Sequence, residues 1–354
     1  MAPHLPIMTT TLTRRSFLRQ TIAFSALATS NVFAHGAPDL RNPDAKHAII
    51  VGDWGWADPA QGQSQVAAAM RRYTLEQKLN PEALLLLGDS WYGDLSGGAD
   101  SPRWQSGFEA MYPEDAFPNR AYTIAGNHDY QHAPISKVEA ELDYAKRKTT
   151  AAGRPMRWTM PSLWYRFVLP KKNPLLTVIA LDSNVPGHRS FGAGFYTMTE
   201  EMRQQQLTWL GEELNKPRDT PFLAVMAHHP MYSNGKHGDH PILIQDWDHL
   251  LREHHVHLYL AGHDHDLQHL EFDGHPTSFF CSGAGGADLY DLHHSKQGRG
   301  PFAEKVFGFS HIEMTSELLT LRHLDENGAV LHAFSKEQDG KVALLNKSSN
   351  SKGA

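Results

Sequence analysis

Two side chains that could bind metal ions follow a short apolar run in the first third of the chain. Four leucines, Leu84–Leu87, precede Gly88; Asp89 follows directly, and Tyr92 lies three residues further on. Four leucines without alternation are too few for a globular helix and are typical of a parallel strand buried on both faces. Ligands bind outside the carboxyl ends of such strands. At such a strand end, Asp89 could bridge two cations and Tyr92 could bind one of them. Considered without other motifs, Asp89 could equally cap a helix and the Tyr92 ring could simply pack in the core.

The same order of apolar run, small residue and polar side chain recurs at four other places. The polar residues placed in this way are Asp53; Asn127, His128 and Asp129; His228 and His229; and His263, Asp264 and His265. Carboxylate, amide and imidazole groups are common ligands of divalent and trivalent metal ions. Five strand ends with such side chains are hard to produce by chance, so together they predict a metal site.

The segments between these runs predict the elements that position the site. Helices are expected over residues 58–79, 104–111, 136–148, 199–214 and 241–254, and paired strands over 165–169 and 175–181. From Leu267 onward the pattern changes to consecutive strands, and Asn327-Gly328 is typical of a hairpin turn. We therefore expect one α/β domain over residues 35–345, with two sheets stacked between helices.

Composition narrows the function classes. The chain has 354 residues, 40% hydrophobic and 20% charged, with a formal net charge of -6 and no Lys/Arg-rich run, so a nucleic-acid partner is not expected. No segment reaches the roughly 20 apolar residues of a membrane span. Cys281 is the single cysteine, which rules out an intramolecular disulfide.

The two ends of the chain are set apart from the predicted domain. Residues 1–34, with Arg14-Arg15 before an apolar run and Val32-Phe33-Ala34 at their end, resemble a twin-arginine export signal. The expectation is a periplasmic or secreted protein that meets the twin-arginine export machinery only transiently. Removal of this segment, which carries three arginines and no acid, takes the net charge from -6 to -9. Residues 346–354 are expected to be a disordered tail and residues 186–196 a mobile surface loop.

Five short motifs resemble, in order, those of purple acid phosphatases, a group of calcineurin-like metallophosphoesterases. The motifs are Gly52-Asp53-Trp54-Gly55, Gly88-Asp89-Ser90-Trp91-Tyr92, Gly126-Asn127-His128-Asp129, Val225-Met226-Ala227-His228 and Gly262-His263-Asp264-His265. The length and the later segments most resemble the small tartrate-resistant type of animals, from about Ala48 to about Ser335. The resemblance implies a four-layer sandwich, in which two mixed β-sheets pack together and helices flank them.

The resemblance also implies a ligand set and a reaction. It assigns Asp53, Asp89, Tyr92 and His265 to Fe(III), and Asp89, Asn127, His228 and His263 to a divalent ion, which is iron, zinc or manganese. His128 and His237 correspond to histidines that contact the substrate and assist the leaving group. The implied reaction is hydrolysis of a small phosphomonoester by in-line attack of a metal-bound hydroxide, with an acidic optimum.

Two departures from the family pattern and two rival functions accompany this assignment. Ser90 stands where the animal enzymes have Asn, and His229 where they have Tyr. A phosphodiesterase on the same scaffold remains an alternative, as does an exported iron-binding or redox protein. Stable membrane association is not expected, and the sequence leaves the natural substrate, the divalent metal and the oligomeric state open.

Overall fold

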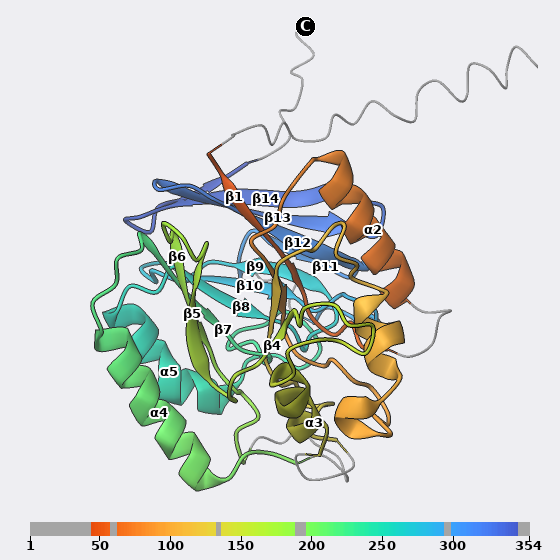
Figure 1. Ribbon diagram of the computed structural model, residues 1–354. Helices are drawn as coiled ribbons and strands as arrows, with labels where there is room; N and C mark the ends of the chain where they lie inside the picture. The colour runs from red at the N-terminus through yellow and green to blue at the C-terminus, as the bar shows by residue number, and fades with distance from the viewer. Residues whose placement is uncertain (1–43, 57–61, 132–135, 188–195, 294–298, 346–354) are drawn as a thin grey trace, which may run out of the picture. The chain divides into compact units, whose positions relative to one another are not determined.

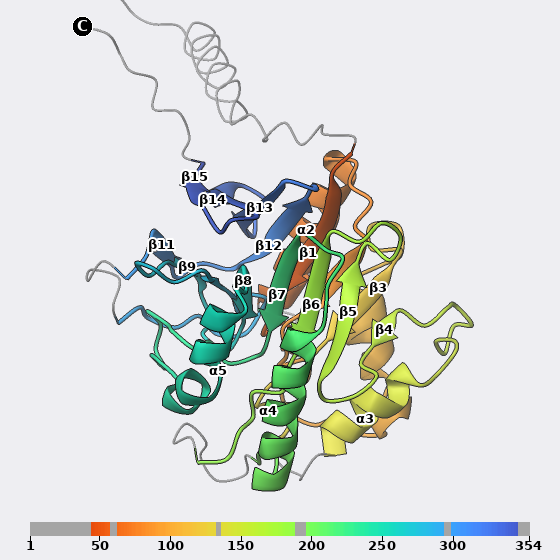
Figure 2. The same cartoon turned by 90° about the vertical axis from the view of Figure 1, so that its left-hand side faces the viewer.

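A computed structural model describes residues 44–56, 62–131, 136–187, 196–293 and 299–345. The predicted export signal, the predicted C-terminal tail and residues 188–195 of the predicted surface loop lie outside these ranges. The described part of the chain forms two β-sheets with helices around them (Figures 1 and 2). Its helices include none long and apolar enough to cross a membrane.

The first sheet has eight strands in the order β15-β14-β13-β12-β1-β2-β3-β4. Strands β1 to β4 run parallel to one another, and β12 to β15 continue the sheet in antiparallel fashion. The bounds are β1 Lys46–Val51, β2 Ala83–Leu86, β3 Arg120–Thr123, β4 Trp158–Thr159, β12 Gly308–Met314, β13 Leu318–Asp325, β14 Val330–Glu337 and β15 Val342–Leu344. The hairpin predicted at Asn327-Gly328 joins β13 to β14, as expected.

The second sheet has seven strands in the order β11-β9-β10-β8-β7-β6-β5. Its central strands β6, β7, β8 and β10 are parallel, and β5, β9 and β11 are antiparallel to their neighbours. The bounds are β5 Tyr165–Leu169, β6 Leu176–Ala180, β7 Phe222–Met226, β8 Leu258–Ala261, β9 Leu267–Leu270, β10 Ser278–Ser282 and β11 Phe302–Glu304. Both sheets are therefore mixed.

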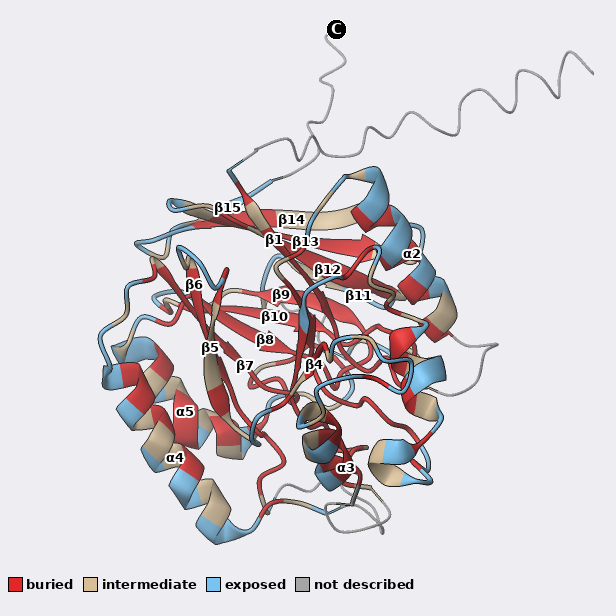
Figure 3. Cartoon of the chain, in the orientation of Figure 1, coloured by how far each residue is buried: buried red, intermediate tan, exposed pale blue. Residues whose placement is uncertain are grey.

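The main hydrophobic core lies between the sheets. Ile50 and Leu85 of the first sheet share one buried cluster with Val178, Leu260 and Phe280 of the second. Because side chains alternate along a strand, each sheet also has an outer face, which helices cover. Figure 3 shows the buried residues concentrated in the strands and on the inner sides of the helices.

Helices cover the outer faces of both sheets. Helices α4 (Glu200–Asn215) and α5 (Pro241–Glu253) share a buried cluster with β6, β7 and β8. Helix α2 (Gly62–Glu76) lies on the first sheet, where Tyr73 contacts His311 of β12 at 3.0 Å. A further helix, α3, spans Ser136–Ala145. The four-layer arrangement predicted from the family resemblance is confirmed.

Three predicted helices extend at least two residues beyond the observed ones. Helix α2 ends at Glu76 rather than near residue 79, because Lys78 adopts a left-handed conformation with φ 53° and Leu79 donates its N–H back to Thr74. Its predicted start at residue 58 lies outside the described residues. Helix α3 ends at Ala145, three residues before the predicted end. The predicted helix over 104–111 is a π-helix over Trp104–Glu109.

A buried aromatic cluster supports the turns that follow β1 and β2. Trp54 packs edge-on against Trp91 with ring centroids 5.7 Å apart, and Trp91 lies 4.6 Å from Trp104. The Trp158 ring lies 4.8 Å from that of Trp104, and because Trp158 belongs to β4 it links the cluster to the first sheet. Trp54 and Trp91 follow Asp53 and Asp89 closely in sequence, so this packing helps to fix the two turns.

A buried ion pair lies beside the aromatic cluster. The Arg157 guanidinium donates to the Glu109 carboxylate at 2.6 Å and to the carbonyl oxygens of Tyr112 and Phe117 at 2.7 and 2.8 Å. Both side chains are almost fully buried, with 4% and 1% exposure. Arg157 therefore joins β4 to the segment that carries Trp104.

Replacing Arg157 by Met should lower the free energy of unfolding by about 3–5 kcal/mol, because Glu109 would be left as a buried unpaired charge. Urea unfolding monitored by tryptophan fluorescence measures the change. Arg154→Met is the matched control, since Arg154 lies 3.9 Å from Glu114 in a half-exposed pair and should cost no more than about 1 kcal/mol. Equal effects of the two substitutions would contradict the assigned role of Arg157.

Candidate metal centre

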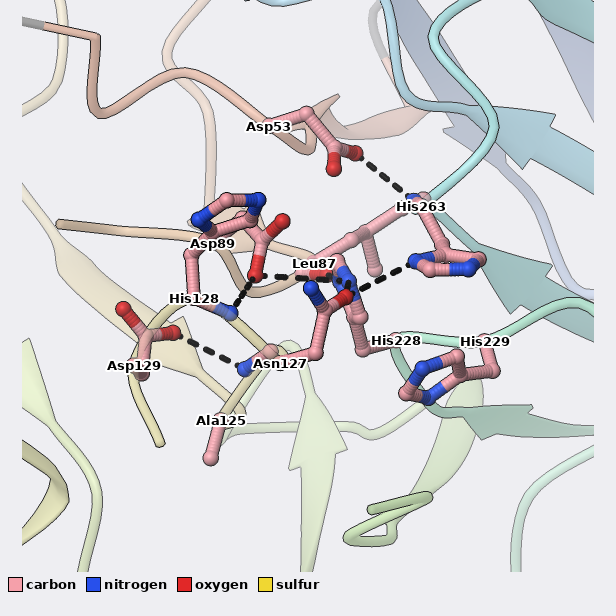
Figure 4. A network of polar contacts seen from close by, with 12 residues as sticks. Asp53, Leu87, Asp89, Ala125, Asn127, His128, Asp129, His228, His229 and His263 are labelled. Carbon is pink, nitrogen blue, oxygen red and sulfur yellow. Dashed lines mark hydrogen bonds and ion pairs between the residues drawn. The ribbon is translucent and has the colours of Figure 1, made fainter. Parts of the chain in front are cut away.

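The ends of five parallel strands meet at one place and carry the polar side chains predicted from the sequence. Strands β1, β2 and β3 of the first sheet lead to Asp53, Asp89 and Asn127, and strands β7 and β8 of the second lead to His228 and His263. Figure 4 shows these side chains gathered around a common centre. The site therefore draws on both sheets, at the carboxyl ends of their parallel strands.

Three of the converging residues have an unusual backbone conformation. Asp53, Asp89 and His263 have φ angles of 57°, 50° and 67°, in the left-handed region that residues other than glycine rarely adopt. Each follows a glycine at the end of a strand. Strained conformations of this kind cost about 1–3 kcal/mol and persist where the surrounding structure determines them, commonly at functional sites.

Glycines at the ends of the strands allow the loops of the site to approach one another. A Cβ atom on Gly126 would lie 2.2 Å from the backbone nitrogen of Asp89, and one on Gly262 would lie 2.5 Å from Asp53 Oδ2. Neither position leaves room for a side chain. Gly126 therefore lets the loops after β2 and β3 approach each other, and Gly262 does the same for the loops after β1 and β8.

The first set of ligand atoms consists of Asp89, Asn127, His228 and His263, which we call the amide-side cluster. The Asn127 Oδ1 atom lies 3.0 Å from His228 Nε2 and 2.8 Å from His263 Nδ1. His228 Nε2 in turn lies 3.4 Å from Asp89 Oδ1. These are the residues that the resemblance assigns to the divalent ion.

The second set consists of Asp53, Asp89, Tyr92 and His265, which we call the phenol-side cluster. The Tyr92 hydroxyl lies 3.4 Å from Asp53 Oδ1, 3.1 Å from Asp89 Oδ2 and 3.1 Å from His265 Nε2. His265 Nε2 and Asp53 Oδ1 are 3.4 Å apart. The structure thus brings together all four residues that the resemblance assigns to Fe(III).

Asp89 belongs to both clusters through different oxygen atoms. Its Oδ1 faces His228, whereas its Oδ2 faces Tyr92. The backbone N–H of His128 donates to Oδ1 at 2.8 Å and holds the carboxylate in this orientation. Each carboxylate oxygen of Asp89 thus faces a different cluster, and bridging of two cations by Asp89 stays a prediction.

The donor and acceptor inventory of the two clusters fits bound cations. His228 Nδ1 lies 2.8 Å from the Leu87 carbonyl, and His265 Nδ1 lies 2.5 Å from the Asp288 carbonyl. A carbonyl can only accept, so each Nδ1 carries hydrogen, and when the ring is neutral its Nε2 lone pair faces the cluster. At the phenol side, the single Tyr92 proton faces three acceptors. Converging lone pairs of this kind are what a cation requires.

The pKa values in the amide-side cluster also favour positive charge at this place. Although burial acts to lower it, the pKa of His228 is raised to about 10 because the Asp89 and Asp53 carboxylates lie nearby. The pKa of Asp89 is well below its usual value, since the His228 charge outweighs the opposing effect of burial. In the absence of metal, a proton on His228 supplies positive charge that a bound ion would supply in its place.

The phenol-side residues have a different balance. Burial, reinforced by Asp89 and Asp53, raises the pKa of Tyr92 well above its usual value. Burial also raises the pKa of Asp53. A phenolate at Tyr92 therefore needs a strong positive charge beside it, because the two neighbouring carboxylates oppose its ionisation.

The two histidines predicted to act on the substrate lie next to the clusters. The His128 ring lies 4.2 Å from that of Tyr92 at a tilt of 38°, and its Nδ1 contacts Gln131 Oε1 at 2.8 Å. The His237 ring lies 4.2 Å from that of His263. His237 is 24% exposed, so it lies at the rim of the site rather than far out in a surface loop.

Several residues that hold the site residues in place were not predicted from the sequence. Asp264 Oδ1 contacts His237 Nδ1 at 2.7 Å, and the Tyr290 ring stacks on His265 at 4.0 Å. Asp129 accepts from the backbone N–H groups of Trp91 and Gly126 at 3.0 and 2.8 Å. Asp129 and Asp264 stood in the motifs without an assigned role, whereas nothing in the local sequence pointed to Tyr290.

His229 is the departure from the family pattern that the structure makes most significant. His228, His229 and His263 form a buried group in which one potential ligand atom from each lies within 4.8 Å of the others. The Ser183 hydroxyl lies 2.8 Å from His229 Nδ1 and also accepts from the His229 backbone N–H. His229 therefore adds an imidazole beside the amide-side cluster.

Comparison with known proteins agrees with this geometry. Residues 47–267, more than half of the chain, match the model of the calcineurin-like phosphoesterase family. Over 303 residues the chain is 27% identical to tartrate-resistant acid phosphatase type 5 of Mus musculus, covering 81% of this chain and 89% of that protein. It is also 27% identical to purple acid phosphatase 7 of Arabidopsis thaliana, covering 81% and 84%.

Solved structures share the fold. The purple acid phosphatase PPD1 of yellow lupin superposes with a TM-score of 0.62 at 16% identity, over 84% of this chain and 55% of that chain. GAP50, described as the anchor in the inner membrane complex of Plasmodium, superposes with a TM-score of 0.66 at 20% identity, over 86% and 90%. With the family match and the two ligand clusters in place, the chain belongs to the calcineurin-like phosphoesterases.

Proposed function

We propose that this protein is an acid phosphatase that hydrolyses phosphomonoesters at a dinuclear metal centre. The observation that carries the proposal is the sharing of Asp89 between the amide-side and phenol-side clusters, which provides two adjacent cation positions. The similarity to tartrate-resistant and purple acid phosphatases over most of the chain supports the reaction class.

The proposed metals are Fe(III) at the phenol-side cluster and iron, zinc or manganese at the amide-side cluster. Hard oxygen ligands with one imidazole suit Fe(III), and the amide-side cluster with two histidines suits a divalent ion. Two such ions, when bound, polarise the phosphoryl oxygens and lower the pKa of coordinated water, the ferric ion more strongly, which favours activity in acid.

The chain's own residues then position the substrate and move a proton. His128 is held beside Asp89 by its backbone hydrogen bond, and His237 is held beside His263 by its contact with Asp264. Both imidazoles border the clusters, where a phosphoryl group would bind. We assign to His128 the protonation of the leaving oxygen and to His237 a contact with the phosphoryl group.

The proposal includes an exported enzyme that acts on a small phosphorylated substrate. The twin-arginine pattern in residues 1–34 supports export to the periplasm or beyond, and the charge of -9 calculated for the remainder disfavours polyanions. A stable association with membrane or nucleic acid is not part of the proposal. Protein recovered from the periplasm should begin at His35, and recovery only of the uncleaved chain from the cytoplasm would contradict export.

The purified protein should hydrolyse a phosphomonoester faster than a phosphodiester, with the rate peaking below neutral pH. Assays of p-nitrophenyl phosphate and bis-p-nitrophenyl phosphate across pH 4–9 measure both properties. Asp89→Asn is the matched variant that retains volume but removes the shared charge, and it should lose both activities. A preference for the diester would support the phosphodiesterase alternative, and metal binding without hydrolysis would support the iron-binding alternative.

Replacing His128 by Ala should slow the reaction by roughly 10²- to 10⁴-fold for esters with poor leaving groups, the range for general acid catalysis. Esters whose leaving group needs no proton should be affected much less. The measurement is kcat/KM for a series of aryl and alkyl phosphates. An equal loss throughout the series would contradict the assigned proton transfer.

Replacing Tyr92 by Phe should remove the visible absorption band of the metal-loaded protein, because a phenolate bound to Fe(III) produces charge-transfer colour. Absorption spectra and elemental analysis of the wild-type and variant proteins test this prediction. His128→Ala leaves the phenol in place and serves as the control. Retention of an unchanged band in Tyr92→Phe would contradict the ferric assignment.

A further inference from the structure

A cleft lies at the amino ends of β1, β2 and β3, whereas the metal centre lies at their carboxyl ends. Its volume is about 650 Å³, within the range of small-molecule sites. Among the residues that line it are Lys46 and Arg120, the first residues of β1 and β3, and Glu82, which directly precedes β2.

The metal centre and the cleft occupy opposite ends of the same three strands. Each of these three residues precedes an acid or amide of the metal centre by seven positions, namely Asp53, Asp89 and Asn127. At about 3.3 Å per residue, the two sites lie roughly 20 Å apart. The cleft is therefore separate from the proposed reaction site.

The rim of the cleft is strongly basic. Lys46, Arg120, Lys171 and Lys172 line it, whereas Glu82 is the carboxylate among the described lining residues. Within the described part of the chain, none of the three lysines forms an ion pair. Arg120 makes a hydrogen bond to the uncharged Thr159 hydroxyl at 3.1 Å and forms no ion pair with a residue that the structure describes. This positive rim stands out in a chain whose net charge is -6.

The floor of the cleft is apolar and partly aromatic. Tyr122, Met156, Leu169 and Pro170 line it together with the basic residues. The Tyr122 ring is stacked on Phe167, with centroids 3.8 Å apart and planes 5° apart, so its position is fixed by packing. A ligand in the cleft could thus place an apolar body against the floor and an acidic group against the rim.

Arg157 also borders the cleft but serves a structural purpose. Its guanidinium is committed to Glu109 and to two backbone carbonyls, and its side chain is 4% exposed. Anion recognition would therefore come from the rim cations, whose side chains are not held by such a network.

We propose that this cleft is a binding site for a small organic anion, a molecule with an aromatic or otherwise apolar body and a sulfonate, phosphate or carboxylate group. The acidic group is held by Lys171, Lys172 and Arg120, and the body lies on Tyr122 and Leu169. The site binds its ligand without converting it, since the metal ligands lie at the other end of the strands. Because the rim is exposed, affinity falls as salt rises.

Isothermal titration calorimetry with 1-naphthalenesulfonate and the mature protein tests the proposal. We expect one binding site whose affinity falls as salt rises from low to physiological ionic strength. Lys171→Ala/Lys172→Ala should weaken binding about tenfold, as expected for the loss of two rim charges. Lys146→Ala/Lys341→Ala is the matched control, because it removes two lysines with 74% and 69% exposed side chains outside the cleft.

The metal centre can be separated from the cleft in the same experiment. Asp89→Asn should leave the affinity for 1-naphthalenesulfonate unchanged, and Lys171→Ala/Lys172→Ala should leave hydrolysis of p-nitrophenyl phosphate unchanged. Loss of binding in Asp89→Asn would place the anion at the metal centre and overturn the proposal. So would an absence of binding to the wild-type protein, or equal weakening by the control variant.

Discussion

The structure depends on one buried carboxylate that is shared between two sets of ligand atoms. Asp89 is only 1% exposed, and a buried charge is costly unless opposite charge or hydrogen bonds compensate it. The His128 backbone N–H supplies one such bond, and the His228 proton supplies charge when metal is absent. The same ligand atoms could also surround a bound cation, so the fold and the proposed chemistry meet at this residue.

The turns that hold Asp89 and its neighbours are expensive in conformational terms. Three of the candidate ligand residues adopt left-handed backbone angles, and glycines such as Gly126 and Gly262 admit contacts that no side chain would allow. Packing around the turns offsets the conformational free energy of these backbone angles. It includes the aromatic cluster of Trp54 and Trp91 and the core between the sheets. Pre-organisation of ligands therefore depends on packing well beyond the metal centre.

The parallel strands of the first sheet present two different environments at their two ends. The carboxyl end gathers acids, amides and imidazoles, while the amino end presents a basic rim over an apolar floor. Because the fold alone also occurs in GAP50, described as an anchor, shared architecture does not establish an activity. The function of each end depends on its side chains. These are the shared Asp89 at the carboxyl end and the lysine and arginine side chains around Lys171 at the amino end.

The sequence by itself determined the strand ends that carry the polar side chains and the bounds of α4 and α5 to within one residue, because these follow from local patterns. Thr199 before α4 and Pro241 at the start of α5 are examples, and both helices form as expected. Only the tertiary structure decided which atoms face each cluster. The stacking of Tyr290 on His265 and the pairing of Arg157 with Glu109 join distant segments, so they depend on how the sheets pack rather than on any local pattern.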